Sequence, residues 1–207
     1  MARNEYAQGV FINCPFDSEY KPLFEAIVFA VLSSSFQPRC ALEIDDSSQV
    51  RIDKIFKIIA ECKYGIHDIS RTEVTSASGL PRFNMPLELG MFLAAKRFGS
   101  SKQRQKVCLV LDSMPYRYQQ FISDIAGQDI QVHNNSAKEA ITVVRNWLRS
   151  ASRATILPGG MEIYRRFQLF EQELLALCAE LKVERNELTF NDSVSIISNW
   201  LRDNTSR

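Results

Sequence analysis

The chain has 207 residues, of which 45% are hydrophobic and 24% charged, the ordinary balance of a globular protein that buries a core. Lys and Arg (25) nearly balance Asp and Glu (24), and the net charge of +1 gives no bulk attraction to a polyanion, so we expect no direct nucleic-acid binding. The five cysteines are scattered and never spaced C-x-x-C, which argues against a disulfide framework or a zinc ribbon. With neither a signal-peptide core nor an apolar run long enough to span a bilayer, we expect a cytoplasmic chain outside the membrane.

Strand-like and helix-like segments alternate along most of the chain. Short apolar runs typical of buried strands are followed by stretches with apolar residues at helical spacing. The expected strands are 9–13, 39–44, 64–69, 106–112 and 130–133, and the expected helices are 20–33, 50–62, 86–97 and 136–149, with a loop at 70–83. This alternation predicts a flavodoxin-like, doubly wound parallel sheet of about five strands. In such sheets ligands bind beyond the carboxyl ends of the strands.

A Pro-Gly-Gly break at residues 158–160 divides the chain. We predict an α/β domain over residues 1–157 and a C-terminal helical extension over residues 158–207. A long helix at 161–181 carries apolar residues at spacings of four and three, and a short last helix carries Trp200. The extension has more acids than bases, which argues against a DNA-binding tail. We expect it to dock on the domain or to join copies of the chain into a homo-oligomer.

Glu88 is the residue that points most directly to chemistry. Pro86 suits the first position of a helix, which places Glu88 in the first turn. The residues three, four and seven positions later are Met91, Phe92 and Ala95, so this face of the helix is apolar. Burial raises the pKa of such a carboxyl and the helix N-terminus lowers it. An ionised, poorly solvated Glu suits a nucleophile or an oxocarbenium stabiliser at a sugar carbon; the alternative is a simple helix cap at the N3 position.

Asp68 ends the third expected strand and is followed by Ser70 and Arg71. A carboxylate at this place can hydrogen-bond ribose hydroxyls, as acidic residues do in dinucleotide sites. The alternative is that Asp68 caps the turn that follows it. His67 precedes it on the strand and faces the other side, where we expect a satisfied core histidine.

The loop after the first strand offers further contacts for a nucleotide. Phe16 can stack on a base or a nicotinamide ring, and Asn13 or Asp17 can bind a ribose. Against this, Asp17 is also a good cap for the helix that follows. Cys14 is disfavoured as a nucleophile because neither histidine follows it at a telling distance.

Other polar clusters are read as ordinary surface. The acids at 43–46 are expected in a solvated loop, and the basic residues between Lys96 and Lys106 in a solvated helix end and loop. Neither a G-x-G-x-x-G nor a Walker A sequence occurs, which argues against a Rossmann dehydrogenase and a P-loop NTPase. The two histidines have no metal-binding spacing, so no metal site is expected.

Residues 11–17 (FINCPFD), 65–70 (GIHDIS) and 84–90 (NMPLELG), in this order, resemble the TIR-like and nucleoside 2-deoxyribosyltransferase-like superfamily. The resemblance covers roughly residues 9–150. It implies that Glu88 is the catalytic residue that attacks or stabilises the anomeric carbon as an N-glycosidic bond breaks, and that Asp68 and the first loop seat the nucleoside. It also implies a role in bacterial antiphage defence. The RFN sequence at 82–84 departs from the approach to the Glu in both deoxyribosyltransferases and TIR NAD hydrolases, which leaves the substrate open.

The sequence therefore predicts cleavage of the N-glycosidic bond of NAD, or of a related nucleotide or nucleoside, by hydrolysis, cyclisation or transfer. NAD is one candidate substrate, and no cofactor is expected. The alternative is a non-catalytic module that binds a nucleotide or another TIR-type surface. For the catalytic reading, the residues expected to hold the base and ribose around Glu88 are Asn13, Phe16, Asp17, Asp68, Ser70, Arg71 and Asn84.

Overall fold

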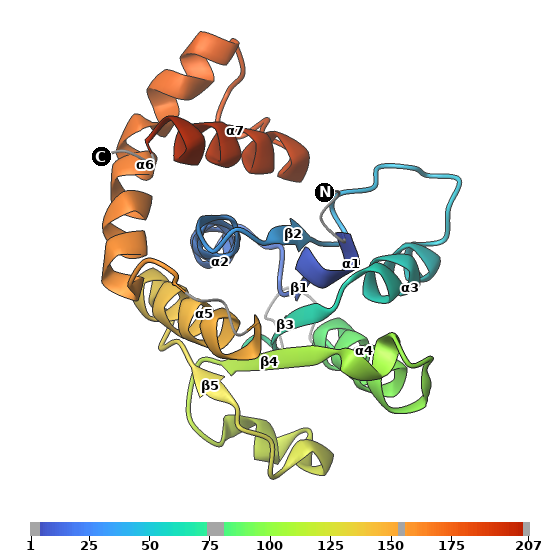
Figure 1. Cartoon of the computed structure of the whole chain (residues 1–207). Helices are drawn as coiled ribbons and strands as arrows, with labels where there is room; N and C mark the ends of the chain where they lie inside the picture. The colour runs from blue at the N-terminus through green and yellow to red at the C-terminus, as the bar shows by residue number, and fades with distance from the viewer. Residues whose placement is uncertain (1–4, 74–80, 153–155, 205–207) are drawn as a thin grey trace.

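The computed structural model describes residues 5–73, 81–152 and 156–204 and shows a parallel sheet between layers of helices (Figure 1). Its five strands run in the order β2-β1-β3-β4-β5, and every neighbouring pair is parallel. The strands are β1 (Gly9–Asn13), β2 (Gln37–Arg39), β3 (Tyr64–Asp68), β4 (Val107–Asp112) and β5 (Gln131–Val132). The predicted flavodoxin-like, doubly wound fold is confirmed.

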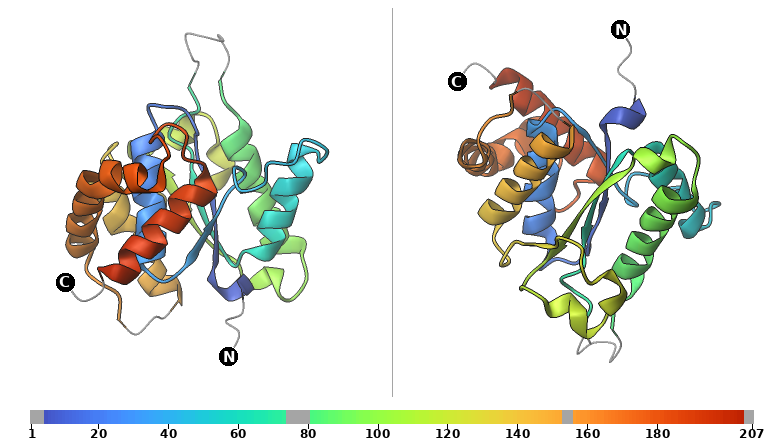
Figure 2. Two further views of the ribbon diagram at one scale, coloured as in Figure 1. Left: turned by 90° about the horizontal axis from the view of Figure 1, so that it is seen from above. Right: turned by 60° about the horizontal axis from the view of Figure 1, so that its bottom comes forward.

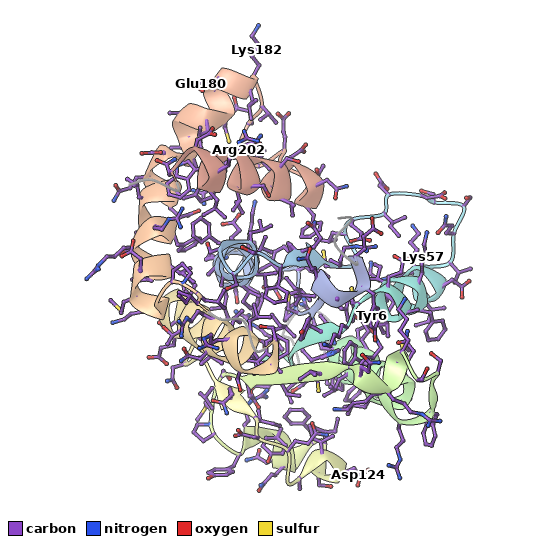
Figure 3. The ribbon with its side chains drawn as sticks, in the orientation of Figure 1. Tyr6, Lys57, Asp124, Glu180, Lys182 and Arg202 are labelled. Carbon is purple, nitrogen blue, oxygen red and sulfur yellow. The ribbon has the colours of Figure 1, made fainter. Side chains whose placement is uncertain are left out.

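Helices cover both faces of the sheet, which is why β1 and β3 are buried along their whole length. On one face lie α2 (Lys21–Ser33) and α5 (Ala137–Ser152), and on the other lie α3 (Arg51–Glu61) and α4 (Asn84–Phe98) (Figure 2, right). The remaining short elements are α1 (Glu5–Gln8), η1 (Gln103–Gln105), η2 (Arg117–Gln120) and η3 (Ser123–Ile125). Charged side chains such as those of Lys57, Glu180 and Lys182 point away from the layers (Figure 3).

The C-terminal helices α6 (Gly160–Leu181) and α7 (Phe190–Asp203) form a further layer outside α2 and α5 (Figure 2). Phe29 of α2 is completely buried, and its ring centre lies 5.4 Å from that of Phe167, 5.5 Å from Phe170 and 6.0 Å from Trp200. One continuous apolar cluster runs from β1 through α2 to both C-terminal helices. Of the two expected roles of the extension, docking on the α/β unit is the one that this packing shows.

Two of the differences between expected and observed element boundaries have a clear physical reason. The helix predicted at 86–97 starts at Asn84, so Pro86 is its third residue, still within the first turn, where an N–H has no helical partner. The strand predicted at 39–44 is instead Gln37–Arg39, with Pro38 at its centre. This is an edge strand, where a proline is tolerated, and its three residues show no apolar run.

Lys106 is buried, so the prediction of a fully solvated basic run was wrong at this position. Its Nζ donates to the backbone oxygens of Ile59 (2.5 Å) and Cys62, and it lies 4.5 Å from the ring centre of Phe92. The ammonium group thereby satisfies carbonyls at the C-terminal end of α3, where a cation is favoured. Burial lowers the pKa of Lys106 to about 8.

Gly65 gives the space in which His67 and Phe92 pack beneath the sheet. A Cβ at this position would lie 2.7 Å from His67 Nε2 and 2.8 Å from Phe92. We therefore expect Gly65→Ala to lower the free energy of unfolding by about 1–3 kcal/mol, because the neighbouring rings must move. Gly90→Ala is the matched control: a Cβ there meets nothing within 4 Å, and alanine favours the helix by about 0.5–1 kcal/mol. Urea denaturation would show opposite signs for the two variants; equal effects would contradict this account.

None of the helices in the described part of the chain has the length and apolar character needed to cross a membrane.

Candidate functional site

The candidate site lies where the carboxyl ends of β1 and β3 meet. The chain leaves β1 toward β2 at one side of the sheet and leaves β3 toward β4 at the other, so the order of strands reverses between them. Ligands of doubly wound proteins bind at such a switch point. Asn13 is in register with His67, which brings the loops after both strands to one place.

Asn13 ties this edge of the sheet to the start of α4. Its Nδ2 donates to the backbone oxygen of Met85 (2.8 Å) and lies 3.0 Å from His67 Nδ1, and the residue is buried. Burial lowers the pKa of His67 to about 3, so the imidazole is neutral and its Nδ1 can accept from the amide. Asn13 thus holds the first turn of α4, and with it Glu88, against the strands. Its predicted contact with a ribose stays a prediction.

Glu88 is 8% exposed and lies on α4 just beyond the first turn. Because the helix begins at Asn84, the alternative of an N3 cap was wrong: no described residue forms a hydrogen bond or ion pair with this carboxylate. Burial raises the pKa of Glu88 to about 7, while the charge of Arg51 lowers it. The pKa is raised overall, so burial outweighs the charge of Arg51. Residues 74–80, which precede this helix, lie outside the described ranges.

Asp68 is fully buried and contacts three polar groups from different parts of the chain. Its Oδ2 lies 2.5 Å from the hydroxyl of Tyr20 and 2.9 Å from Nε2 of His133, and its Oδ1 accepts from the backbone N–H of Ser70 (2.8 Å). Nδ1 of His133 accepts from the N–H of Asn135 (3.0 Å), which leaves Nε2 as the nitrogen that carries the proton toward Asp68. Burial alone would raise the pKa of Asp68, but its contact with His133 and its hydrogen bonds from Ser70 and Tyr20 hold it below its usual value.

The contacts of Asp68 bear on its two interpretations. The bond from Ser70 is the turn-capping interaction that the sequence allowed, and the other two contacts join β3 to α2 and to the end of β5. Asp68 therefore acts as an anchor that fixes the floor of the site. A direct contact with a ribose stays a prediction.

The rim of the site carries two ion pairs. Asp17 Oδ1 accepts from the N–H of Tyr20 (2.9 Å), and Oδ2 lies 2.8 Å from Arg82. The first contact closes the turn before α2 and is not the helix cap allowed for Asp17, because α2 begins at Lys21 with Tyr20 at its cap position. Arg71 lies 2.7 Å from Glu19. Both pairs join the loop before α2 to residues near α4 or after β3. Asn84, the first residue of α4, is exposed.

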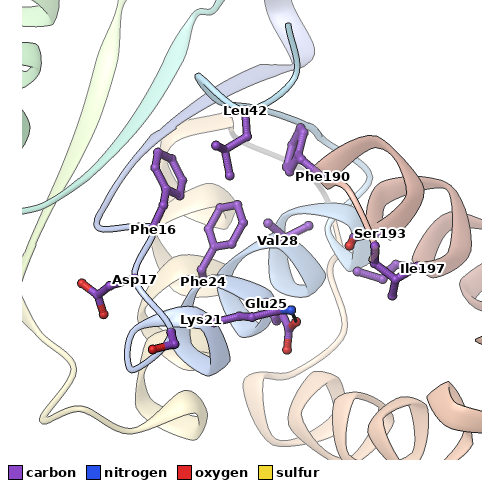
Figure 4. A pocket seen from close by; sticks show the side chains of 12 residues that line it. Phe16, Asp17, Lys21, Phe24, Glu25, Val28, Leu42, Phe190, Ser193 and Ile197 are labelled. Carbon is purple, nitrogen blue, oxygen red and sulfur yellow. Dashed lines mark ion pairs between the residues drawn. The ribbon is translucent and has the colours of Figure 1, made fainter. Parts of the chain in front are cut away.

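Phe16 faces a different direction from the one the sequence suggested. Its ring centre lies 5.4 Å from that of Phe24 in α2, and it lines a pocket shared with α7 (Figure 4). The structure therefore places Phe16 on the α2 side of the first loop, whereas Glu88 is carried by a helix on the opposite face of the sheet. The fold therefore does not place Phe16 beside Glu88, where it was expected to stack on the base of the substrate.

Sequence reasoning missed several residues that build this edge. Tyr20 and His133 complete the contacts of Asp68, and Arg117 joins the buried Asp112 (2.8 Å, Nε to Oδ1) to the backbone oxygen of Ile69 (2.6 Å). A signal was present for two of them. Asp112 ends β4 and His133 directly follows β5. Both therefore lie at carboxyl ends of strands, where ligands of such sheets bind, and this position is the signal that the sequence offered for them.

Tyr20→Phe should show how much the Asp68 anchor contributes to stability. We expect the free energy of unfolding at pH 7 to fall by about 2 kcal/mol, because a buried hydrogen bond to a charged acceptor is lost while the ring remains. Tyr116→Phe, at an exposed tyrosine, should change it by less than about 0.5 kcal/mol. Urea denaturation measures both, and an equally small change in the two variants would remove Asp68 as an anchor.

Comparison of the chain with protein-family models, curated proteins and solved structures gives no match.

Proposed function

We propose that this protein cleaves the N-glycosidic bond of NAD, or of a related nucleotide or nucleoside, with Glu88 at the anomeric carbon. The observation that supports this most is a nearly buried carboxyl at the switch point of the sheet, with a pKa of about 7 and no hydrogen-bond partner among the described residues. A carboxyl group whose pKa lies near neutral pH, and whose oxygens accept no hydrogen bond, is a candidate catalytic group.

The chemistry suits NAD in particular. When the bond between nicotinamide and ribose breaks, the electron pair goes to the nicotinamide nitrogen, which was positively charged, so the base leaves neutral and needs no proton. Positive charge develops on the ribosyl group, where ionised Glu88 can stabilise it or form a bond to the anomeric carbon. Poor solvation of the carboxylate strengthens this attraction. Water then completes hydrolysis, and a nucleophile within the same molecule would complete cyclisation.

Incubation of the full chain with NAD and with nucleosides, followed by chromatography of the released base, tests the proposal. We expect Glu88→Gln to lower base release from the accepted substrate at least about a hundredfold, because the charge at the anomeric carbon is lost. Asp53→Asn removes one negative charge from the exposed side of α3 and should leave the rate within about twofold. Equal turnover by Glu88→Gln would remove Glu88 from the mechanism. Saturable binding of NAD without turnover would favour the non-catalytic module.

A further inference from the structure

A pocket of about 150 Å³ lies between α2 and the C-terminal helices, on the side of the first loop away from α4 (Figure 4). Four segments of the chain build it, so it exists only because α7 docks on the α/β unit. The lining residues on which the argument depends are Phe16, Lys21, Phe24, Glu25, Leu42 and Phe190.

Aromatic rings form the apolar part of this pocket. The ring centre of Phe24 lies 5.4 Å from that of Phe16 at an angle of 83°, and 6.0 Å from that of Phe190 at 31°. Phe16 and Leu42 are 37% and 43% exposed, so they stand at the mouth, whereas Phe190 is buried. Rings set at such angles favour contact with the edge or face of another ring. A cavity of about 150 Å³ lined by apolar side chains is large enough for benzene, so the pocket has room for one six-membered ring.

A carboxylate with spare acceptor capacity stands at the polar side of the pocket. Glu25 Oε1 lies 3.9 Å from Lys21 Nζ and Oε2 lies 3.5 Å from Arg185, both longer than a good charged hydrogen bond. Arg185 is held more closely by Glu171, at 2.9 Å. Burial and the nearby Glu171 raise the pKa of Glu25, and the charges of Arg185 and Lys21 lower it without offsetting that rise.

The other charges at the rim do not reverse this preference. Asp17 already accepts from the N–H of Tyr20 and pairs with Arg82, and Lys21 is the one cation among the lining residues. The lining therefore carries two carboxylates against one ammonium group. Arg82 balances the charge of Asp17, whereas the contacts of Glu25 with Lys21 and Arg185 are long and leave acceptor sites on its carboxylate. An ammonium group placed at Glu25 gains a hydrogen-bond acceptor there, which an added carboxylate would not.

We propose that this pocket binds a small aromatic amine, with its single ring among Phe16, Phe24 and Phe190 and its ammonium group at Glu25. The site is separate from the one proposed for N-glycosidic cleavage and does not depend on that activity. For a ligand of about ten non-hydrogen atoms we expect a dissociation constant on the order of 1 mM.

Titration of the full chain with phenethylamine, followed by NMR of the phenylalanine rings, tests the proposal. Saturable shifts confined to rings of the pocket are expected. Propylamine, which lacks the ring, and phenylacetate, which carries the opposite charge, should each bind at least about tenfold more weakly. The absence of saturable shifts, or binding of phenylacetate as tight as that of phenethylamine, would overturn the proposal.

Two variants keep the test independent of folding. Glu25→Gln keeps the shape of the side chain and should weaken phenethylamine about tenfold while leaving benzyl alcohol, an uncharged ring, unchanged. Ser193→Phe adds a ring at the lining of the pocket and should abolish binding of both probes while the thermal unfolding temperature is kept. If phenethylamine binds Ser193→Phe as it binds the unaltered chain, the ligand sits elsewhere and the assignment of this pocket is wrong.

Discussion

A chain that ends at Leu157 is expected to lose cooperative folding, although the sequence divides most visibly after this residue. Removal of α6 and α7 takes away the buried side chains of both helices and uncovers the outer face of α2. The lost side chains are Ile163, Phe167, Phe170, Leu174 and Cys178 of α6, and Phe190, Ile196, Ile197 and Trp200 of α7. Phe29 is completely buried against Phe167, Phe170 and Trp200, and a large apolar side chain that loses its burial costs about 1.5–3 kcal/mol. A whole domain is stable by only about 5–15 kcal/mol, so uncovering Phe29 and its neighbours on α2 removes much of the stability of the shortened chain.

Urea denaturation monitored by circular dichroism would measure this directly. The full chain and a chain that ends at Asn204, which keeps both helices, should each unfold in one sigmoidal transition. The chain of residues 1–157 should show a gradual loss of signal and a tendency to aggregate, because Phe29 and its apolar neighbours are exposed. A sharp transition in the short chain would establish that the first unit folds on its own. In that case the packing between α2 and the C-terminal helices would be an interface between two domains.

Local pattern was sufficient to predict most of the fold. Residues 9–13 and the long helix near 161–181 stand out because a continuous apolar run and a regular apolar spacing are properties of the segment itself. β2 was misplaced because its three residues include Pro38 and owe their conformation to pairing with β1 at the edge of the sheet. Its position is thus set by tertiary contacts that no short window contains.

The same distinction separates the site residues that were predicted from those that were missed. Glu88 could be found because its apolar helix neighbours are visible at fixed spacing in the sequence. The burial of Lys106 depends on carbonyl groups at the end of α3, and that of Asp68 on Tyr20 and His133, which are 48 and 65 positions away in the chain. Partners at such separations come together only when the sheet has formed.

Glu88→Gln should make the protein more stable at pH 8 and leave its stability nearly unchanged at pH 4. The pKa of this carboxyl is about 7 in the folded chain, against an ordinary value of 4.5. Between these values the folded state binds more protons than the unfolded state, so the stability linked to Glu88 is complete below pH 4.5 and is lost as the pH rises through 7. The difference between the two pKa values corresponds to about 3 kcal/mol in the free energy of unfolding. Because Gln is neutral throughout, the variant avoids that loss above pH 7.

Denaturation of Glu88→Gln, Asp53→Asn and the unaltered chain at pH 4 and pH 8 separates this effect from a general change in packing. The free energy of unfolding of Glu88→Gln should exceed that of the unaltered chain by up to about 3 kcal/mol at pH 8, whereas Asp53→Asn should differ by less than about 0.5 kcal/mol at either pH. An equal effect of Glu88→Gln at both pH values would show that its carboxylate is well solvated. If Glu88→Gln is more stable than the unaltered chain but no longer releases the base, the destabilising charge of Glu88 is kept for its catalytic role. Sites of chemistry commonly reduce stability in this way.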